Sequence, residues 1–290
     1  MLEHFVTPET NLQLFFDQLD PMHFHTIHLA KGIYRQKIKL SLSNVTLIGA
    51  GRKDTIIVYN DYSYKLHEDD LLYNTFRTST FTVTGSNNIL KALTIQNDAG
   101  HGPFIGQAIA LSIYGNNNVI ANCQIIGHQD TLFIGPLPED LALRYAHILP
   151  PDERTLNITS STFTNCSITG NVDFIFGSGN CLFKTCELIF NGDGYLAAPS
   201  TQLQALGFIF YHCTISSLSP SYNVVLARPW RNHGKVTFIN NQFINLNIIN
   251  RYDAWDKQHF EFREYPYYEH PLSRNLDHLF KQRIVDLYFS

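Results

Sequence analysis

The sequence of 290 residues predicts an all-β fold, a solenoid in which short strands coil around one core. Short segments recur along the chain, each alternates apolar with other residues as a strand does, and most are bounded by Gly, Asn or Ser. Their unequal spacing fits coils that share strands and differ in the loops between them. The segments are ILKALTI (89–95), VIANCQII (119–126), TFTNCSIT (162–169), LFKTCELI (182–189), FIFYHCTI (208–215) and QFINLNII (242–249).

Both ends of the chain carry helical patterns, and the N-terminal one is expected to cover the solenoid. Thr7 and Pro8, followed by apolar residues at helical spacing, indicate an N-terminal helix with Thr7 as its cap. Because an open solenoid exposes its core at each end, we assign residues 1–25 as a cap and 26–250 as coils. Residues 251–290 are predicted to form an extended tail over 255–270 and a helix over 275–290. No Pro-, Gly- or Ser-rich linker divides the chain, so we expect one domain over 1–290.

Composition excludes several classes of partner. The chain is 44% hydrophobic and 16% charged, as expected for a packed core, and its net charge of −4 offers no basic surface for nucleic acid. No apolar run approaches the roughly 18 residues of a membrane span. The N-terminus lacks the pattern of a secretory signal, which predicts a cytoplasmic protein, although a secreted protein that has lost its leader has the same sequence. We expect a monomer.

Four of the five cysteines hold the same place in four repeats. They are Cys123, Cys166, Cys186 and Cys213. A metal or redox cluster is one interpretation, but no His accompanies them and their positions follow the repeat. We therefore expect buried free thiols, and no metal or organic cofactor.

Polar and charged side chains interrupt the apolar pattern at four stretches. These are GQAIAL (106–111), GHQDTLF (127–133), VDFIFG (172–177) and LARPW (226–230). Two carboxylates and a guanidinium could satisfy one another as a structural cluster, since buried charges need partners. Acyl transfer, in contrast, requires a nucleophile, a proton shuttle and donors for an oxyanion. Two acids, one Arg and two side-chain amides provide a group for each of these roles.

These four stretches, in this order, resemble the signature motifs of the pectin methylesterase family. The likeness runs from about Ile27 to Asp256, and IHLAKGIYRQKIKLSLSNVTLIGAGRKDTII (27–57) resembles the family's opening coils. The resemblance implies a right-handed parallel β-helix. It also implies an aspartyl esterase of pectin catabolism and cell wall modification, which hydrolyses methyl esters at C6 of galacturonate in pectin or methylated oligogalacturonides and releases methanol.

The resemblance assigns a role to each matching position. Asp173 matches the nucleophile, Asp130 the acid that protonates methanol and then activates water, and Arg228 the partner of the nucleophile. Gln107 and Gln129 match the amide donors to the oxyanion. We expect Arg228 to favour the charged form of Asp173, and the neighbouring carboxylate to raise the pKa of Asp130. Substrate contacts are expected from Trp230, Phe176, His128, Tyr252 and Trp255.

Several positions depart from the family's pattern. His128 replaces an aromatic residue, Ala227 a Gly, and Gln36 a Glu. Tyr252-Asp253-Ala254-Trp255 aligns with a GWxxW pattern, so that Tyr252 replaces a substrate-stacking Trp. A Pro-rich segment, 135–154, separates the two acids, and we expect it to form a stiff loop at the cleft that favours short oligomers over intact polymer.

Other functions compete with this interpretation. A polygalacturonase would use paired carboxylates, and Gly100-His101-Gly102 and Glu68-Asp69-Asp70 resemble fragments of its motifs, but in the wrong order and without its NTD and RxK motifs. A pectate lyase would need a cluster of acids for calcium. A non-catalytic sugar-binding β-helix, or an esterase or thioesterase for another acyl substrate, stays open.

Overall fold

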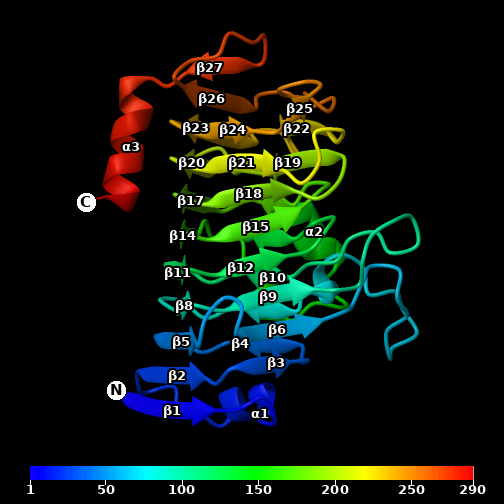
Figure 1. Cartoon of the computed structure of the whole chain (residues 1–290), viewed down its shortest axis with the longest axis vertical. Helices are drawn as coiled ribbons and strands as arrows, with labels where there is room; N and C mark the ends of the chain where they lie inside the picture. The colour runs from blue at the N-terminus through cyan, green and yellow to red at the C-terminus, as the bar shows by residue number, and fades with distance from the viewer. Residues whose placement is uncertain (290) are drawn as a thin grey trace.

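The strands stack in three parallel sheets that wind as a right-handed β-helix, as the sequence predicts (Figure 1). The structure is a computed structural model, and it describes residues 1–289. Each of the coils from β2 to β25 contributes one strand to each sheet, and we name the sheets A, B and C in the order in which a coil passes through them.

Sheet A has eleven strands and runs the whole height of the stack. Its strands are β1 (Leu2–Val6), β2 (His25–Leu29), β5 (Val45–Gly49), β8 (Ile89–Lys91), β11 (Asn118–Ala121), β14 (Ser160–Thr164), β17 (Asn180–Lys184), β20 (Phe208–Tyr211), β23 (Lys235–Ile239), β26 (Glu261–Tyr265) and β27 (Ser273–Asn275).

Sheets B and C have eight strands each. Sheet B contains β3 (Gly32–Tyr34), β6 (Thr55–Tyr59), β9 (Thr94–Asn97), β12 (Gln124–Ile126), β15 (Ser167–Gly170), β18 (Glu187–Phe190), β21 (Thr214–Ser217) and β24 (Gln242–Ile244). Sheet C contains β4 (Ile38–Leu40), β7 (Phe81–Val83), β10 (Leu111–Ile113), β13 (Leu132–Ile134), β16 (Ile175–Gly177), β19 (Gly194–Pro199), β22 (Asn223–Ala227) and β25 (Asn247–Ile248). The helices are α1 (Leu12–Asp17), α2 (Glu139–Arg144) and α3 (His278–Tyr288), with 3₁₀ turns η1 (Phe76–Thr78) and η2 (Pro151–Glu153).

Columns of identical side chains fill the core because parallel strands pair in register. Phe163, Phe183, Phe210 and Phe238 are direct neighbours in sheet A, and their rings stack at centroid distances of 5.1, 4.9 and 5.0 Å. The repeated cysteines form a second column, in which each thiol lies against a backbone carbonyl of the coil before it. All five cysteines are buried and free, which confirms the interpretation as packed thiols.

The corners between strands explain the recurrent asparagines. The residue before each thiol of the column turns the chain from sheet A to sheet B with a positive φ, as Asn122 (53°) and Asn165 (52°) do. A second set at Asn44, Asn87 and Asn117 turns the chain into sheet A. Asn adopts the left-handed region at a lower cost than most residues, so a solenoid with tight corners selects it.

The N-terminal cap differs in detail from the prediction. Helix α1 buries Leu12 and Phe16 against the first coil, but Asn11 caps it through a hydrogen bond from the amide of Leu14, so Thr7 as the cap is wrong. The first residues also add an unpredicted strand, β1, to the edge of sheet A. The alternation of Leu2–Val6 is too short to separate from a loop by sequence alone.

The C-terminal part extends the stack further than predicted. The 255–270 run is not a tail, because β26 within it pairs in parallel with β23 and β27 continues the ladder. Helix α3 follows as expected, and it lies along the flank of the stack rather than over its end (Figure 1). Its residues Phe280 and Ile284 pack with Leu182, Ile209 and Ile239 of sheet A. Among residues 1–289, no helix is long and apolar enough to cross a membrane.

Burial of the thiol column predicts its chemical behaviour. After denaturation without reductant, titration with a thiol reagent should count all five cysteines, whereas the native protein should react slowly, because burial raises the pKa of the Cys123 thiol to about 12. A count below five after denaturation would mean that disulfides exist and would contradict the structure.

Candidate active site

The two acids occupy equivalent positions in consecutive coils. Strands β13 and β16 pair with Leu132 opposite Ile175, so Asp130 and Asp173 each stand two residues before a matched pair, although the 135–154 segment separates them in sequence. The amide of Asp130 donates to the carbonyl of Val172 at 3.0 Å, which ties the two corners together. Both acids have positive φ, 61° and 50°, a conformation that is enriched at functional sites because it carries backbone strain.

Arg228 reaches the Asp173 corner from the end of β22. It follows Ala227, which pairs with Ala197 of β19, as Ala197 pairs with Ile175 of β16. Nε and Nη2 of Arg228 donate to the two carboxylate oxygens of Asp173 at 2.8 and 2.6 Å. The bidentate geometry is the strongest form of such a pair, and the expected ion pair is present.

Two aromatic rings fix the guanidinium of Arg228. Its central carbon lies 3.8 Å from the ring centroid of Tyr195 and 3.9 Å from that of Trp255. Asp253 braces both rings, since its carboxylate accepts from the Trp255 amide at 2.8 Å and from the Tyr195 hydroxyl at 3.5 Å. Rotation of Arg228 away from Asp173 would therefore lose two cation–π contacts as well as the ion pair.

Burial affects the two carboxyls to different extents. Burial raises the pKa of Asp130 well above its ordinary value, the charge of Asp173 raises it further, and Arg228 lowers it only in part. Burial also raises the pKa of Asp173, but the hydrogen bonds and charge of Arg228 oppose that rise. Arg228 thus acts in the expected direction without fully offsetting burial, and Asp130 holds its proton more strongly than Asp173 does.

Gln107 and Gln129 carry side-chain amides on the same cleft. Neither side chain forms a hydrogen bond with another residue in the described part of the chain, so both remain able to donate to a ligand. Their backbones are fixed: the amide of Gln107 donates to the Ser63 hydroxyl at 3.2 Å, and the carbonyl of Gln129 accepts from Ala108 at 3.2 Å. Gly106 precedes Gln107 with φ of +69°, and a Cβ there would lie 2.5 Å from the Ser63 oxygen.

The acids, Arg228 and the amides open into one cleft of about 360 Å³. An aromatic wall stands on one side, in which the rings of Phe176 and Trp230 lie 5.6 Å apart and Phe76 and Tyr145 lie 5.5 Å apart. The cleft is lined by Thr75, Phe76, Gln107, Gln129, Asp130, Leu141, Arg144, Tyr145, Asp173, Phe176, Ala198, Arg228, Trp230, Arg231 and Trp255. Eight of the ten predicted site residues are therefore together.

The other two predicted residues lie elsewhere. Tyr252 is fully buried in the solenoid core, where its ring stacks on Phe262 at 5.0 Å and its hydroxyl contacts the Glu264 carboxylate, so a role in sugar stacking is wrong. The chain passes from inside to outside the coil between Tyr252 and Trp255, and only Trp255 faces the cleft. His128 is not part of the cleft lining either, because its half-buried ring packs against His101 at 4.8 Å.

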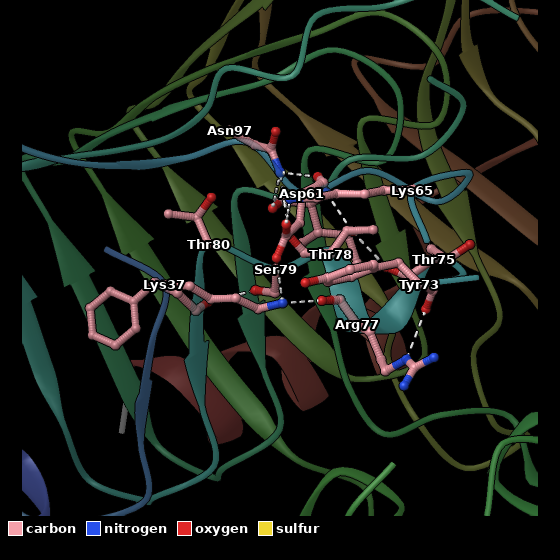
Figure 2. A network of polar contacts seen from close by, with 12 residues as sticks. Lys37, Asp61, Lys65, Tyr73, Thr75, Arg77, Thr78, Ser79, Thr80 and Asn97 are labelled. Carbon is pink, nitrogen blue, oxygen red and sulfur yellow. Dashed lines mark hydrogen bonds and ion pairs between the residues drawn. The ribbon is translucent and has the colours of Figure 1, made fainter. Parts of the chain in front are cut away.

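A buried charge network anchors the loop that carries Phe76. Asp61, at the start of the 60–80 loop, is fully buried and accepts from the ammonium groups of Lys37 and Lys65, each at 2.7 Å (Figure 2). Lys37 also donates to the carbonyl of Arg77, one residue beyond Phe76. Asn97 adds hydrogen bonds from its amide to the carbonyls of Asp61 and Thr78 at 2.8 and 3.3 Å, so both ends of the loop are held (Figure 2).

Comparison with known proteins identifies the family. The sequence model of the Pectinesterase family matches residues 17–136 and 155–273, most of the chain. The chain belongs to the pectinesterase family. It is 30% identical to a pectinesterase from Petunia integrifolia over 77% of its length and 27% identical to Pectinesterase 31 of Arabidopsis thaliana over 72%. It spans 55% and 61% of these two proteins, so it covers little more than half the length of the curated relatives it matches.

Solved structures agree on the fold. The pectin methylesterase PemA from Erwinia chrysanthemi superposes with a TM-score of 0.76, at 22% identity, over 97% of this chain and 94% of that one. A pectin methylesterase in complex with a hexasaccharide superposes with a TM-score of 0.74, at 21% identity, over 95% and 91%. At these identities the likeness establishes the β-helix fold.

The 135–154 segment is where this member departs from the pectinesterase family, since residues 137–154 lie outside both matched ranges. It is a packed wall rather than an irregular loop. Leu137, Leu141 and Leu149 share a cluster with Phe76 and Phe133. Lys39 on β4 donates to the carboxylates of Asp152 and Glu153 at 2.8 and 2.9 Å, which fixes the far end of the segment.

Sequence reasoning missed several residues in and behind the cleft. Tyr195 on β19 and Phe76 in η1 stand outside the four polar stretches, and only the stacking of the coils brings them to Arg228 and Trp230. Arg144 and Tyr145 belong to the 135–154 segment, for which the prediction gave a position but no contacts. Among residues 1–289, no group of three or more His, Cys, Asp or Glu side chains is placed to hold a metal ion.

Replacement of Asp61 tests the anchoring network. Asp61→Asn leaves the Lys37 ammonium without its counter-ion where burial already lowers its pKa, so we expect a loss of about 2–3 kcal/mol in the free energy of unfolding in urea. Asp54→Asn, which removes the partner of the exposed Lys31 ammonium, is the matched control and should cost much less. Equal losses in the two variants would contradict a special role for Asp61.

The raised pKa of Asp130 predicts how stability depends on pH. Between the ordinary pKa of an Asp and the raised one, the folded state holds a proton that the unfolded state has released, so stability falls as pH rises. Asp130→Asn removes this pH-dependent loss of stability, because the Asn side chain does not ionise. The rise in Tm of the variant over the original protein should therefore be larger at about pH 7 than at about pH 3. Asp70→Asn, at an exposed corner with the same positive φ, should show no such trend. A constant difference across pH would contradict burial of an ionisable Asp130.

Proposed function

We propose that this protein is a carboxylic ester hydrolase that removes methyl groups from C6 of esterified galacturonate and releases methanol. One observation carries the proposal: a buried Asp held by a bidentate Arg lies in a cleft with a second, more strongly protonated Asp and two side-chain amides that have no hydrogen-bond partner among residues 1–289. These are the groups that acyl transfer requires, and membership of the pectinesterase family supports the same chemistry.

In the first half-reaction, a carboxylate oxygen of Asp173 attacks the carbonyl carbon of the methyl ester. The carbonyl oxygen gains negative charge and accepts hydrogen bonds from the amides of Gln107 and Gln129. The C–O bond to the methoxy group breaks, and Asp130 gives its proton to that oxygen, so methanol leaves. Asp173 and the substrate are then joined as a mixed anhydride.

In the second half-reaction, Asp130 is a carboxylate and accepts a proton from water. The resulting hydroxide attacks the acyl carbon of the substrate, the anhydride bond breaks, and Asp173 leaves as a carboxylate. The product is a galacturonate carboxyl, and Asp130 has recovered its proton. Arg228 stabilises the carboxylate of Asp173 as the leaving group, an effect that its aromatic clamp maintains in both steps.

The substrate that fits is a methyl-esterified galacturonan or a short oligomer of it. Trp230 and Trp255 present aromatic surface at the cleft, and such rings stack well on the apolar faces of sugars. A structural neighbour is a pectin methylesterase in complex with a hexasaccharide, which supports a saccharide as ligand here. We propose that the protein acts as a monomer, since every group in the mechanism comes from one chain.

We further propose a preference for short methylated oligomers over intact polymer. The 135–154 segment adds Leu141, Arg144 and Tyr145 to the cleft, and its apolar packing and the Lys39 ion pairs hold it as a wall. Residues 137–154 lie outside the ranges that match the family model, so this fixed wall is an addition to the family's fold. Such a wall would restrict the entry of a long polysaccharide more than that of a short oligomer.

Substitution of the nucleophile tests the proposed chemistry. Asp173→Asn keeps the shape of the side chain and removes its nucleophilic charge, so methanol release should fall to background while circular dichroism shows an unchanged fold. Gln107→Ala and Gln129→Ala should each reduce kcat by about 10²-fold, because each removes one donor to the oxyanion. Near-normal methanol release by the Asp173→Asn variant would remove Asp173 from the mechanism.

Shortening the wall tests the substrate preference. Replacing residues 137–154 with a short Gly-Ser linker should raise the ratio of polymer to oligomer activity, measured as methanol release from pectin and from methylated oligogalacturonides. Lys39→Met in the same variant avoids an unpaired ammonium where Asp152 and Glu153 were. An unchanged ratio would show that the segment does not limit access.

A further inference from the structure

Three arginines line the cleft, and they differ in what balances their charge. Arg228 is paired with Asp173, and Arg231 is paired with Asp140 at 3.0 Å. The Arg144 side chain forms no ion pair, hydrogen bond or cation–π contact with another residue of the 1–289 range. The third guanidinium therefore leaves the cleft with one uncompensated positive charge.

The acidic side chains of the cleft do not neutralise the positive charge of Arg144. Asp173 is already engaged by two hydrogen bonds from Arg228, and burial keeps Asp130 protonated over a wider pH range than an ordinary Asp. Asp140, the nearest acid in sequence on the same helix, points to Arg231. An anion that enters this side of the cleft would find Arg144 unoccupied.

The position of Arg144 is held by packing on both sides. It is the last residue of α2, between Leu141, which is buried against the aromatic wall, and Tyr145, whose ring contacts Phe76. The Arg231–Asp140 pair ties the start of α2 to the end of the LARPW stretch. The backbone that carries Arg144 is therefore fixed against the cleft, and only the guanidinium end must become ordered when a ligand binds.

The substrate class contains one anion that this group could recognise. A methylated galacturonate unit is neutral at C6, whereas a demethylated unit carries a carboxylate, and a guanidinium binds a carboxylate through two parallel hydrogen bonds. We propose that Arg144 is a specificity residue that binds the free carboxylate of a demethylated galacturonate, so that the enzyme selects partly demethylated oligomers. This inference rests on the proposed function and adds to it the pattern of methylation that the cleft prefers.

The same assignment explains what the 135–154 segment adds to the chemistry. Arg144 lies within residues 137–154, outside the ranges that match the family model, so this charge is a feature of the segment rather than of the β-helix. Each turnover produces a new carboxylate on the oligomer. A cleft that binds this product beside the next ester would favour further turnover on chains that are already partly processed.

Binding of an unmethylated oligomer tests the assignment without catalysis. Tetragalacturonate is titrated calorimetrically into the original protein and into Arg144→Gln, Arg144→Lys and Lys53→Gln. Arg144→Gln should weaken binding about three- to tenfold, the range for one exposed charge-assisted contact, and Arg144→Lys should weaken it less. Lys53→Gln, which removes an exposed cation outside the cleft lining, is the control for net charge and should bind as the original does.

Kinetics on two substrates of equal length separate this inference from the proposed function. For a partly demethylated oligomer, Arg144→Gln should raise KM by the same factor as the binding loss with kcat unchanged. For the fully methylated oligomer, which offers Arg144 no carboxylate, KM should rise by a clearly smaller factor. Equal effects on the two substrates, or unchanged tetragalacturonate binding, would overturn the inference. Absence of methanol release by the original protein would contradict the esterase, while the binding experiment would still decide the role of Arg144.

Discussion

The register of sheet C is the constraint on which the rest of the site depends. Parallel strands in register place each residue about 4.8 Å from its counterpart in the next coil, whatever the length of the loop between them. Asp130 and Asp173 thus become neighbours across a long insertion, and the alignment of β22 with β19 and β16 brings Arg228 within hydrogen-bond distance of Asp173. A slip of one residue in β16 or β22 would turn these side chains to the opposite face of the sheet and dismantle the site.

Burial and charge give Asp130 and Asp173 different tendencies to hold a proton, although their side chains are chemically identical. Both lose solvation, which favours the protonated form of each, but only Asp173 receives a bidentate guanidinium. The Arg228 side chain is in turn held between Tyr195 and Trp255, so its effect is directed to one carboxyl. The difference in protonation that the proposed mechanism needs follows from this asymmetry and requires no difference in residue type.

Features of the fold and the site that are encoded in contiguous or repeated residues could be predicted from the sequence, whereas features that arise from the stacking of coils could not. The solenoid, the thiol column and the polar stretches are repeated or contiguous in sequence, so periodicity revealed them. Tyr195 and Phe76 reach the site only through stacking, which the sequence pattern does not report. Tyr252 was wrongly assigned because a motif aligns residues but does not tell which face of the coil they occupy, and that face changes between Tyr252 and Trp255. Strand β1 and the coil at β26 were missed because short edge segments carry few alternating residues.

Arg228 keeps the pKa of the Asp173 carboxyl below the pKa of the Asp130 carboxyl, and the proposed mechanism depends on this difference. Carbon-13 NMR titration of the aspartate carboxyls measures it directly, with each signal assigned by its loss in Asp173→Asn or Asp130→Asn. We expect Asp173 to titrate at lower pH than Asp130, and we expect Arg228→Gln to move the Asp173 titration to higher pH because burial then acts unopposed. An Asp173 titration that stays in place in Arg228→Gln, or that lies above the titration of Asp130 in the original protein, would contradict this expectation.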